Sequence, residues 1–118
     1  MAVTTDEAVA TLLERAAAAR AARDAFAAEV RARVVQRMAE QLGSGTEAWL
    51  IGSLAWGGFG ERSDIDVVLR GATPEQACRL EVGLTRALRL PVDMLRFEEL
   101  PDSFRKRVVQ QGVRLDGK

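Results

Sequence analysis

Two carboxylates, Asp64 and Asp66, flank one apolar residue at the start of a segment rich in β-branched residues. Alternate side chains of a strand share a face, so both carboxylates point to one side and Ile65 points to the core. Carboxylates held side by side repel each other unless a cation lies between them, and hard oxygen ligands suit Mg²⁺. We therefore predict metal ligation here, in preference to two surface acids on a solvated strand edge.

A third carboxylate, Asp93, lies between Val92 and Met94 in another strand candidate. If this strand is a neighbour of the segment Ile65–Leu69, Asp93 lies beside the first two carboxylates on the same face. Three carboxylates can hold two metal ions about 3.5–4 Å apart, an arrangement that serves in-line phosphoryl or nucleotidyl displacement. The alternative is an ordinary polar residue near the start of a strand.

Gly52-Ser53 ends the preceding strand candidate, and ten residues separate it from Asp64. Glycine lets the backbone approach a phosphate closely, and serine offers both its N–H and its hydroxyl. An Asp-x-Asp pair alone is a weak signal, but chance rarely places a Gly-Ser dipeptide at this fixed distance upstream. The combination predicts a site for a triphosphate tail beside a metal site.

The residues that are missing narrow the chemistry further. The chain contains no His and no Tyr, and Cys78 is its one cysteine. These absences exclude imidazole general bases, Ser-His and Cys-His nucleophile pairs, His-containing zinc sites and an internal disulfide framework. Any catalytic chemistry in this chain therefore has to be carried out by carboxylates. We expect Cys78 to be a buried structural thiol on the apolar side of its helix.

The composition is that of a globular protein. The chain has 118 residues, 47% hydrophobic and 29% charged, with 17 basic and 17 acidic side chains. This predicts one domain over 1–118. We expect a helical segment at 1–43 and, from the carboxylates and the Gly-Ser segment described above, a catalytic core at 46–115. A net charge of zero argues against direct nucleic-acid binding, and no apolar run approaches the roughly 18 residues of a membrane span. Without a recognisable targeting signal, we expect a cytoplasmic protein.

The N-terminal segment is rich in Ala, Arg and Glu and has the spacing of a helix. A possible capping box from Thr4 to Glu7 opens it, apolar side chains recur every three or four residues, and Gly43-Ser44-Gly45 ends it. One unbroken helix from Thr4 to Leu42 would be about 58 Å long. Either the helix breaks near Ala19–Arg23 and forms a hairpin, or its first half projects as a partner-binding or dimerisation arm.

The rest of the chain alternates short elements. Strands are expected at Ala48–Ile51, Ile65–Leu69 and Pro91–Phe97, and helices at Pro74–Arg89 and Asp102–Gln111. Helices that alternate with strands favour an α/β sheet covered by helices over a helical bundle. The predicted fold class is therefore α/β.

The pattern Gly52-Ser53, ten residues, Asp64-x-Asp66 resembles the signature of the nucleotidyltransferase superfamily, whose members include DNA polymerase beta and kanamycin nucleotidyltransferase. The short chain, Pro91-Val92-Asp93 and the ending from Leu100 to Val113 are most similar to the minimal nucleotidyltransferases. The resemblance covers about Glu47 to Leu115. It implies a small mixed β-sheet flanked by helices.

Roles of site residues follow from this resemblance. It implies that Gly52 and Ser53 bind the triphosphate of ATP, and Ser63 is a further nucleotide-binding candidate. It implies that the Asp-x-Asp pair, with Asp93, holds two Mg²⁺ ions, and that Asp93 helps to activate the acceptor hydroxyl. All three carboxylates are therefore predicted to be catalytic.

The resemblance also implies a partner. Minimal members often act as antitoxins of HEPN-domain ribonuclease toxins, and some transfer AMP from ATP to a tyrosine of the toxin. This predicts a magnesium-dependent protein adenylyltransferase. One alternative is an antitoxin that neutralises its toxin by binding alone. Another is transfer to a small molecule such as an aminoglycoside, for which so short a chain leaves little room unless a partner supplies the acceptor site.

The sequence allows two interpretations each for Trp56 and for the basic cluster at 104–107. Many relatives carry Arg or Lys where Trp56 stands, so Trp56 either packs in the core or meets a nucleobase. The cluster Phe104-Arg105-Lys106-Arg107 spreads around a helix, which favours a solvated face over contact with an acidic partner or with phosphates.

Overall fold

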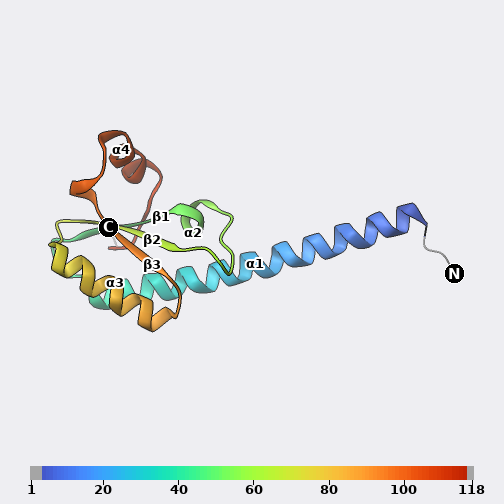
Figure 1. The fold of residues 1–118 in the computed structure, drawn as a ribbon, viewed down its shortest axis with the longest axis horizontal. Coiled ribbons are helices and arrows are strands. Elements are labelled where there is room, and N and C mark those ends of the chain that lie inside the picture. Colours follow the sequence, from blue (N-terminus) through green and yellow to red (C-terminus); the bar gives the residue numbers. More distant parts are fainter. Residues whose placement is uncertain (1–3, 117–118) are drawn as a thin grey trace.

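A four-stranded mixed β-sheet forms the centre of the computed structural model, which describes residues 4–116 (Figure 1). The strands are β1 (Glu47–Ile51), β2 (Ile65–Arg70), β3 (Val92–Arg96) and β4 (Val113–Arg114), in the order β3-β2-β1-β4. β1 is antiparallel to β2 and to β4, whereas β2 is parallel to β3. The predicted α/β class with a mixed sheet is confirmed.

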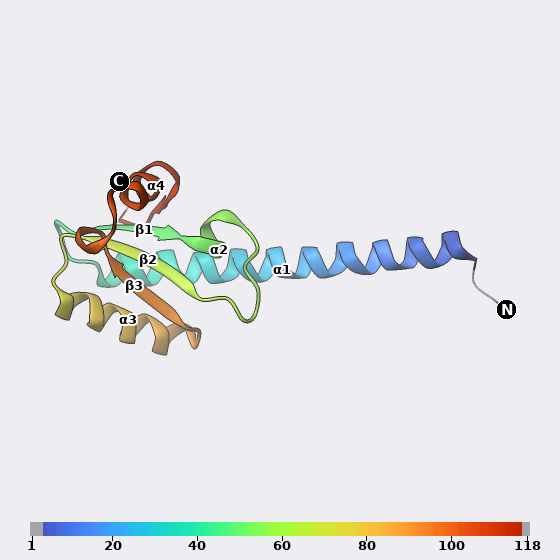
Figure 2. The same ribbon diagram turned by 45° about the horizontal axis from the view of Figure 1, so that its top comes forward.

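Helices cover both faces of this sheet. They are α1 (Thr5–Gln41), α2 (Gly52–Trp56), α3 (Pro74–Leu88), the 3-10 turn η1 (Phe97–Glu99) and α4 (Asp102–Gln111). The second half of α1 lies with α3 on one side of the strands, and α4 lies on the other (Figures 1 and 2). The short β1–β2 connection carries α2 at one end of the sheet.

The alternation of side chains along the strands divides the core into two clusters. In β1, Ala48 and Leu50 pack under α1 and α3, while Trp49 and Ile51 pack under α4. In β2, Val67 faces the first cluster and Val68 the second. Both faces of the sheet are therefore covered, and the strands are apolar on both sides along most of their length.

α1 is one unbroken helix, and its first half projects from the sheet (Figure 2). The Thr4 hydroxyl accepts a hydrogen bond from the Glu7 N–H at 3.1 Å, which confirms the capping box. No Gly or Pro interrupts the alanine-rich middle, so nothing in the sequence breaks the helix. The molecule is consequently 66 Å long but only 31 Å and 22 Å across. The structure thus selects the projecting arm over the hairpin.

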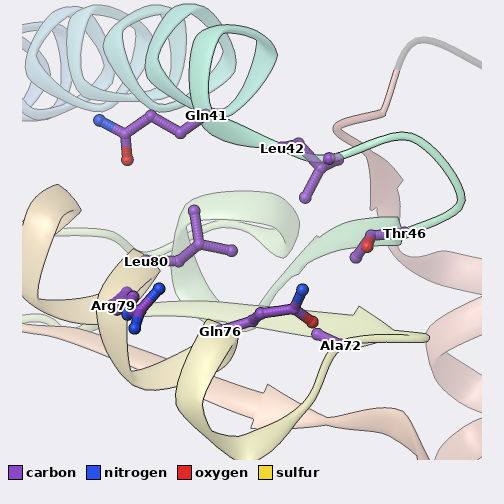
Figure 3. Close-up of a pocket in the computed structure, with 8 residues that line it drawn as sticks. Gln41, Leu42, Thr46, Ala72, Gln76, Arg79 and Leu80 are labelled. Atoms are coloured by element: carbon purple, nitrogen blue, oxygen red, sulfur yellow. The ribbon is translucent and has the colours of Figure 1, made fainter.

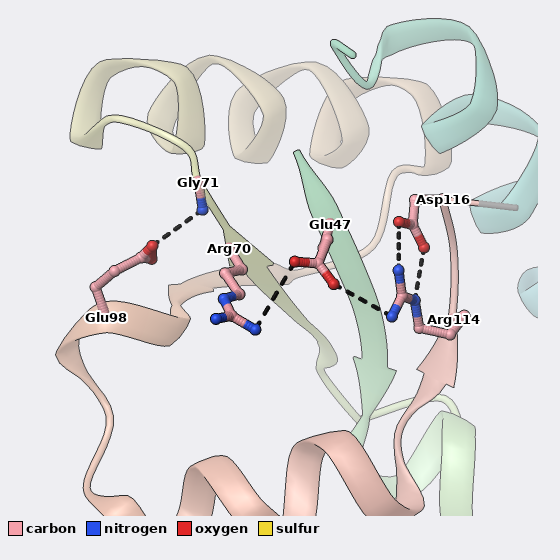
Figure 4. Close-up of polar contacts among 6 residues, drawn as sticks. All are labelled: Glu47, Arg70, Gly71, Glu98, Arg114 and Asp116. Carbon is pink, nitrogen blue, oxygen red and sulfur yellow. Dashed lines mark hydrogen bonds and ion pairs between the residues drawn. The ribbon is translucent and has the colours of Figure 1, made fainter. Parts of the chain in front are cut away.

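A set of polar contacts ties the sheet edge to its neighbouring loops (Figure 4). Glu47 pairs with Arg70 at 3.8 Å and with Arg114 at 3.3 Å, and Arg114 binds Asp116 at 2.6 Å. The Gly71 N–H donates to Glu98 at 2.9 Å. The Glu47–Arg114 pair holds β4, a two-residue strand that the sequence pattern does not predict, against β1.

Gly112 follows the last residue of α4, and the space around it explains why this position is a glycine. Gly112 ends the helix with φ −67°, an ordinary value, so no left-handed conformation requires glycine there. Its requirement is space, because a Cβ at this position would lie 2.5 Å from the Val108 carbonyl oxygen and 3.1 Å from the Trp49 side chain.

Gly112→Ala is therefore expected to destabilise the fold by about 3 kcal/mol, because a backbone carbonyl cannot yield as a flexible side chain can. Gly43→Ala is the matched control, since a Cβ there meets nothing within 4 Å. Urea unfolding of both variants measures the difference. Equal stability of the two variants would contradict this account of Gly112.

One predicted placement on α3 is wrong. Ala77, Leu84 and Leu88 form the buried stripe of this helix, but Cys78, expected on its apolar side, is exposed. One residue along a helix is a rotation of about 100°, which carries Cys78 off the stripe that its neighbour Ala77 occupies.

Among the described helices, none is both long and apolar enough to cross a membrane.

Candidate functional site

Asp66 and Asp93 lie directly opposite each other in the parallel register of β2 and β3. On β2, Asp66 shares a face with Val68, which packs under α4, so both carboxylates belong to the α4 side of the sheet. Asp64 precedes β2 and is exposed. The condition that the two strands are neighbours is met, and their register brings Asp93 beside Asp66 of the Asp-x-Asp pair.

The three carboxylates influence one another electrostatically. Partial burial raises the pKa of Asp66, and the negative charges of Asp93 and Asp64 raise this pKa further. Asp66 is half-buried, whereas the other two are exposed to solvent. The folded chain therefore holds an ionised Asp66 at a cost, which a cation between the carboxylates would offset.

The donor chemistry of this cluster fits Mg²⁺, which prefers carboxylate oxygens. Within residues 4–116, however, no three acidic or cysteine side chains are placed close enough together to hold a metal ion. Asp64, Asp66 and Asp93 therefore need side-chain rotation to form one ligand set. The exposure of Asp64 and Asp93 leaves them room for that rotation.

Gly52 brings the Gly-Ser segment against this cluster. Its φ is +72°, and a Cβ would lie 2.5 Å from the Asp66 Oδ2 atom. Only glycine can thus let the backbone pass so close to the carboxylate in this conformation. Ser53 follows in the first turn of α2, and its carbonyl accepts a hydrogen bond from the Gly57 N–H at 2.8 Å.

Ser63 shapes the glycine-rich connection that follows α2. Its hydroxyl accepts a hydrogen bond from the Gly60 N–H at 3.0 Å, and its own N–H donates to the Gly60 carbonyl at 3.1 Å. These two bonds close the turn just before Asp64. Ser63 therefore has a structural role, and its predicted contact with nucleotide stays a prediction.

Trp56 lies at the surface, so of the two alternatives left open for it the structure excludes packing in the core. Its side chain is 36% exposed. The indole N–H donates to the Gln111 carbonyl at 2.8 Å, and the Arg107 guanidinium lies 4.3 Å from the ring centroid. Trp56 thus joins α2 to the end of α4, since a cation over the ring face and a hydrogen bond at its edge both stabilise the contact.

Two other arginines hold neighbouring segments in place, and their sequence positions do not indicate these contacts. Arg31 of α1 donates to the carbonyls of Leu54 and Ala55 at 3.2 Å and 3.0 Å. Arg105 is half-buried and donates to the Phe97 carbonyl at 2.9 Å. The predicted solvated face of the 104–107 cluster therefore holds for Lys106 and is wrong for Arg105, while Arg107 is exposed but lies over Trp56.

Two of the cavities beside the sheet differ in whether predicted site residues line them. One, of about 390 Å³, lies between α1 and the α2 segment, and its lining includes Ser53. The other, of about 330 Å³, lies between the end of α1 and α3, where Leu42, Thr46 and Leu80 line it (Figure 3). Its lining contains none of the predicted site residues. We therefore assign the functional site to the Ser53 end of the sheet.

Comparison with known proteins found solved structures of similar fold. A putative minimal nucleotidyltransferase has 26% identity and a TM-score of 0.58, over 76% of this chain and 92% of that one. A toxin–antitoxin structure with AMP-PNP has 24% identity and a TM-score of 0.59, over 72% and 71%. A tri-AMPylated Shewanella oneidensis HEPN toxin in complex with MNT antitoxin has 21% identity and a TM-score of 0.54, over 78% and 73%.

No curated protein matches the chain significantly. The family model described as "Polymerase beta, Nucleotidyltransferase" matches residues 36–118, which contain the whole sheet and all six predicted site residues. The chain therefore belongs to the polymerase beta-type nucleotidyltransferase family.

Proposed function

We propose that the chain transfers AMP from ATP to a tyrosine of a HEPN ribonuclease toxin and thereby acts as its antitoxin. The observation that carries the proposal is the contact of Gly52 with Asp66, which places the Gly-Ser segment beside the Asp66–Asp93 pair. The similar structures with AMP-PNP and with an AMPylated HEPN toxin support the nucleotide and the partner.

The reaction is one displacement at phosphorus. The acceptor hydroxyl releases its proton to solvent and its oxygen forms a bond to the α-phosphorus. The bond to the oxygen that bridges the α- and β-phosphates breaks, and pyrophosphate leaves. Mg²⁺ ions, when bound, neutralise phosphate charge and make the acceptor hydroxyl a better nucleophile.

The side chains of this chain supply position and charge. Asp64, Asp66 and Asp93 would hold the two metal ions, and Asp93 would help to activate the acceptor hydroxyl. Ser53 offers its hydroxyl to the triphosphate beside Gly52. The chain has no Tyr of its own, so a tyrosine acceptor has to lie on another protein.

The test uses the wild-type protein with ATP, Mg²⁺ and its co-encoded HEPN partner. We expect an AMP-sized mass increase on a tyrosine-containing peptide of the partner and loss of its ribonuclease activity. Omission of ATP serves as the control. Silencing of the ribonuclease without ATP and without a mass change would instead establish neutralisation by binding alone.

A feature of the arm supports direct binding to the partner as well. Val9, Leu12 and Leu13 are 48%, 63% and 65% exposed, and their spacing places them on one face of α1. This part of α1 lies outside the residues that the family model matches. We place the HEPN toxin on this apolar face, so that the arm recognises the partner while the sheet modifies it.

Replacing Leu12 and Leu13 together by Asp is expected to weaken the complex with the toxin at least about tenfold, because two apolar side chains leave the interface. The free protein should change in stability by less than about 0.5 kcal/mol, since both residues are exposed. Thr11→Asp with Ala18→Asp is the matched control, because it adds the same charge to the opposite face. Calorimetric titration measures the affinities, and equal affinity of the two double variants would contradict this placement.

A further inference from the structure

The cavity between α1 and the α2 segment carries two arginines that the reaction described above does not use. Arg20 and Arg23 of α1 line this 390 Å³ space together with Asp24, and Ser53 and the Gly57–Gly58 turn line it from the other side. It therefore joins the base of the projecting arm to the Gly-Ser segment. Ser53 belongs to this lining and also follows Gly52, the residue in contact with Asp66.

The position of these arginines is fixed by core packing. Phe26 of α1 stacks on Phe59 of the glycine-rich connection, with ring centroids 5.8 Å apart. Phe59 is 3% exposed, and Val30, one turn further along α1, is 2% exposed. Arg23 lies three residues before Phe26, so this stack anchors the arm within one helical turn of the cavity.

The charges in this cavity have no partner in the fold. Within residues 4–116, neither Arg20 nor Arg23 makes a hydrogen bond or ion pair, and both are exposed. With Asp24 counted, the lining carries a net charge of +1. By contrast, Arg31 binds two carbonyls and Arg107 covers Trp56, so these nearby cations already have structural partners.

We propose that Arg20 and Arg23 bind the terminal phosphates of the nucleotide, as a polyphosphate subsite supplied by α1. The inference rests on the proposed function and names the residues that hold the end of the triphosphate tail. The tail runs from the carboxylates past the Ser53 hydroxyl to the two guanidinium groups, which match phosphate oxygens in charge and geometry. The helix that carries the arm thereby becomes part of the nucleotide site.

The test compares Arg20→Gln with Arg23→Gln against wild type in calorimetric titrations with tripolyphosphate, ATP and adenosine at fixed salt. Gln has nearly the helix propensity of Arg, so α1 remains intact. We expect each replacement to weaken tripolyphosphate and ATP binding about tenfold, because each removes one charged phosphate contact. Adenosine binding should be the same in all variants.

Arg15→Gln is the matched control, since Arg15 is an exposed arginine of the same helix that lines no part of this cavity. Unchanged tripolyphosphate affinity in the Arg20 and Arg23 variants would overturn the inference. An equal loss in Arg15→Gln would also overturn it, because the effect would then be general attraction. Failure of the wild type to bind tripolyphosphate would do so as well.

AMP transfer to the partner separates this inference from the proposed function. If tripolyphosphate binding depends on the two arginines but no AMP is transferred, the result supports the phosphate subsite and overturns the proposed adenylyltransferase activity. If the arginine variants transfer AMP with the same KM for ATP as the wild type, the result supports the proposed enzyme activity and overturns the phosphate subsite.

Discussion

Replacing Asp64 and Asp66 together by Asn is expected to reduce AMP transfer at least about 10³-fold, because the variant loses two metal-binding carboxylates of the cluster. The backbone of β2 should be unaffected, since Asn has nearly the shape of Asp. Asp93 remains in its place opposite the mutated Asp66. The rate of AMP incorporation into the HEPN partner, at saturating ATP and Mg²⁺, measures the loss.

The same variant is expected to be more stable than the wild type. Burial and the charges of Asp93 and Asp64 raise the pKa of Asp66, so the folded chain binds this proton more tightly than the unfolded chain does. Stability linked to Asp66 is therefore fully present below its ordinary pKa and is lost as the pH rises through the raised value. At pH 7 Asn removes this cost, which screening limits to less than about 1 kcal/mol, or a few degrees in Tm.

Magnesium offers an independent measurement of the same site. Mg²⁺ that binds only the folded wild type raises its Tm by mass action, whereas the double variant should show no such rise. Glu29→Gln, a change at an exposed acid of α1, is the control and should alter neither activity nor the response to Mg²⁺. Wild-type transfer rates in the double variant would refute the role given to these carboxylates.

Local pattern was sufficient to predict most of the sheet. β2 is a run of β-branched and aliphatic residues, and its predicted bounds, Ile65–Leu69, differ from the observed strand by one residue. The third strand was predicted too long at its end, because Phe97 begins η1 and not a continuation of β3. β4 could not be predicted, since two residues carry no periodic signal and its pairing with β1 is a tertiary contact.

The site was predictable where it depends on spacing along the chain and unpredictable where it depends on how helices meet. The pairing of Asp66 with Asp93 follows from the adjacency of two strands, which was the stated condition. Trp56, by contrast, is an aromatic residue in an apolar context, and only the position of α4 shows that its indole binds Gln111. Arg20 and Arg23 could not be assigned to the cavity from the sequence, because their position depends on the direction of α1. The sequence leaves open whether this segment forms a hairpin or a projecting arm.

Gly52→Ala is expected to damage both stability and activity. A Cβ at φ +72° costs about 1–2 kcal/mol in backbone strain, and the same Cβ would lie 2.5 Å from the Asp66 Oδ2 atom. The carboxylate then has to move, and a displacement of about 1 Å in a reacting site can cost about 10²-fold in rate. Urea unfolding and the AMP-transfer rate measure the two effects.

Gly45→Ala is the control that distinguishes backbone strain from the steric clash with Asp66. Gly45 has a similar φ of +86°, but a Cβ there meets nothing within 4 Å. It should therefore share the backbone cost of Gly52→Ala and keep the wild-type rate of transfer. Equal activity in the two variants would mean that Gly52 serves only the turn. A loss confined to Gly52→Ala would mean that the close approach of this backbone to Asp66 is part of the catalytic site.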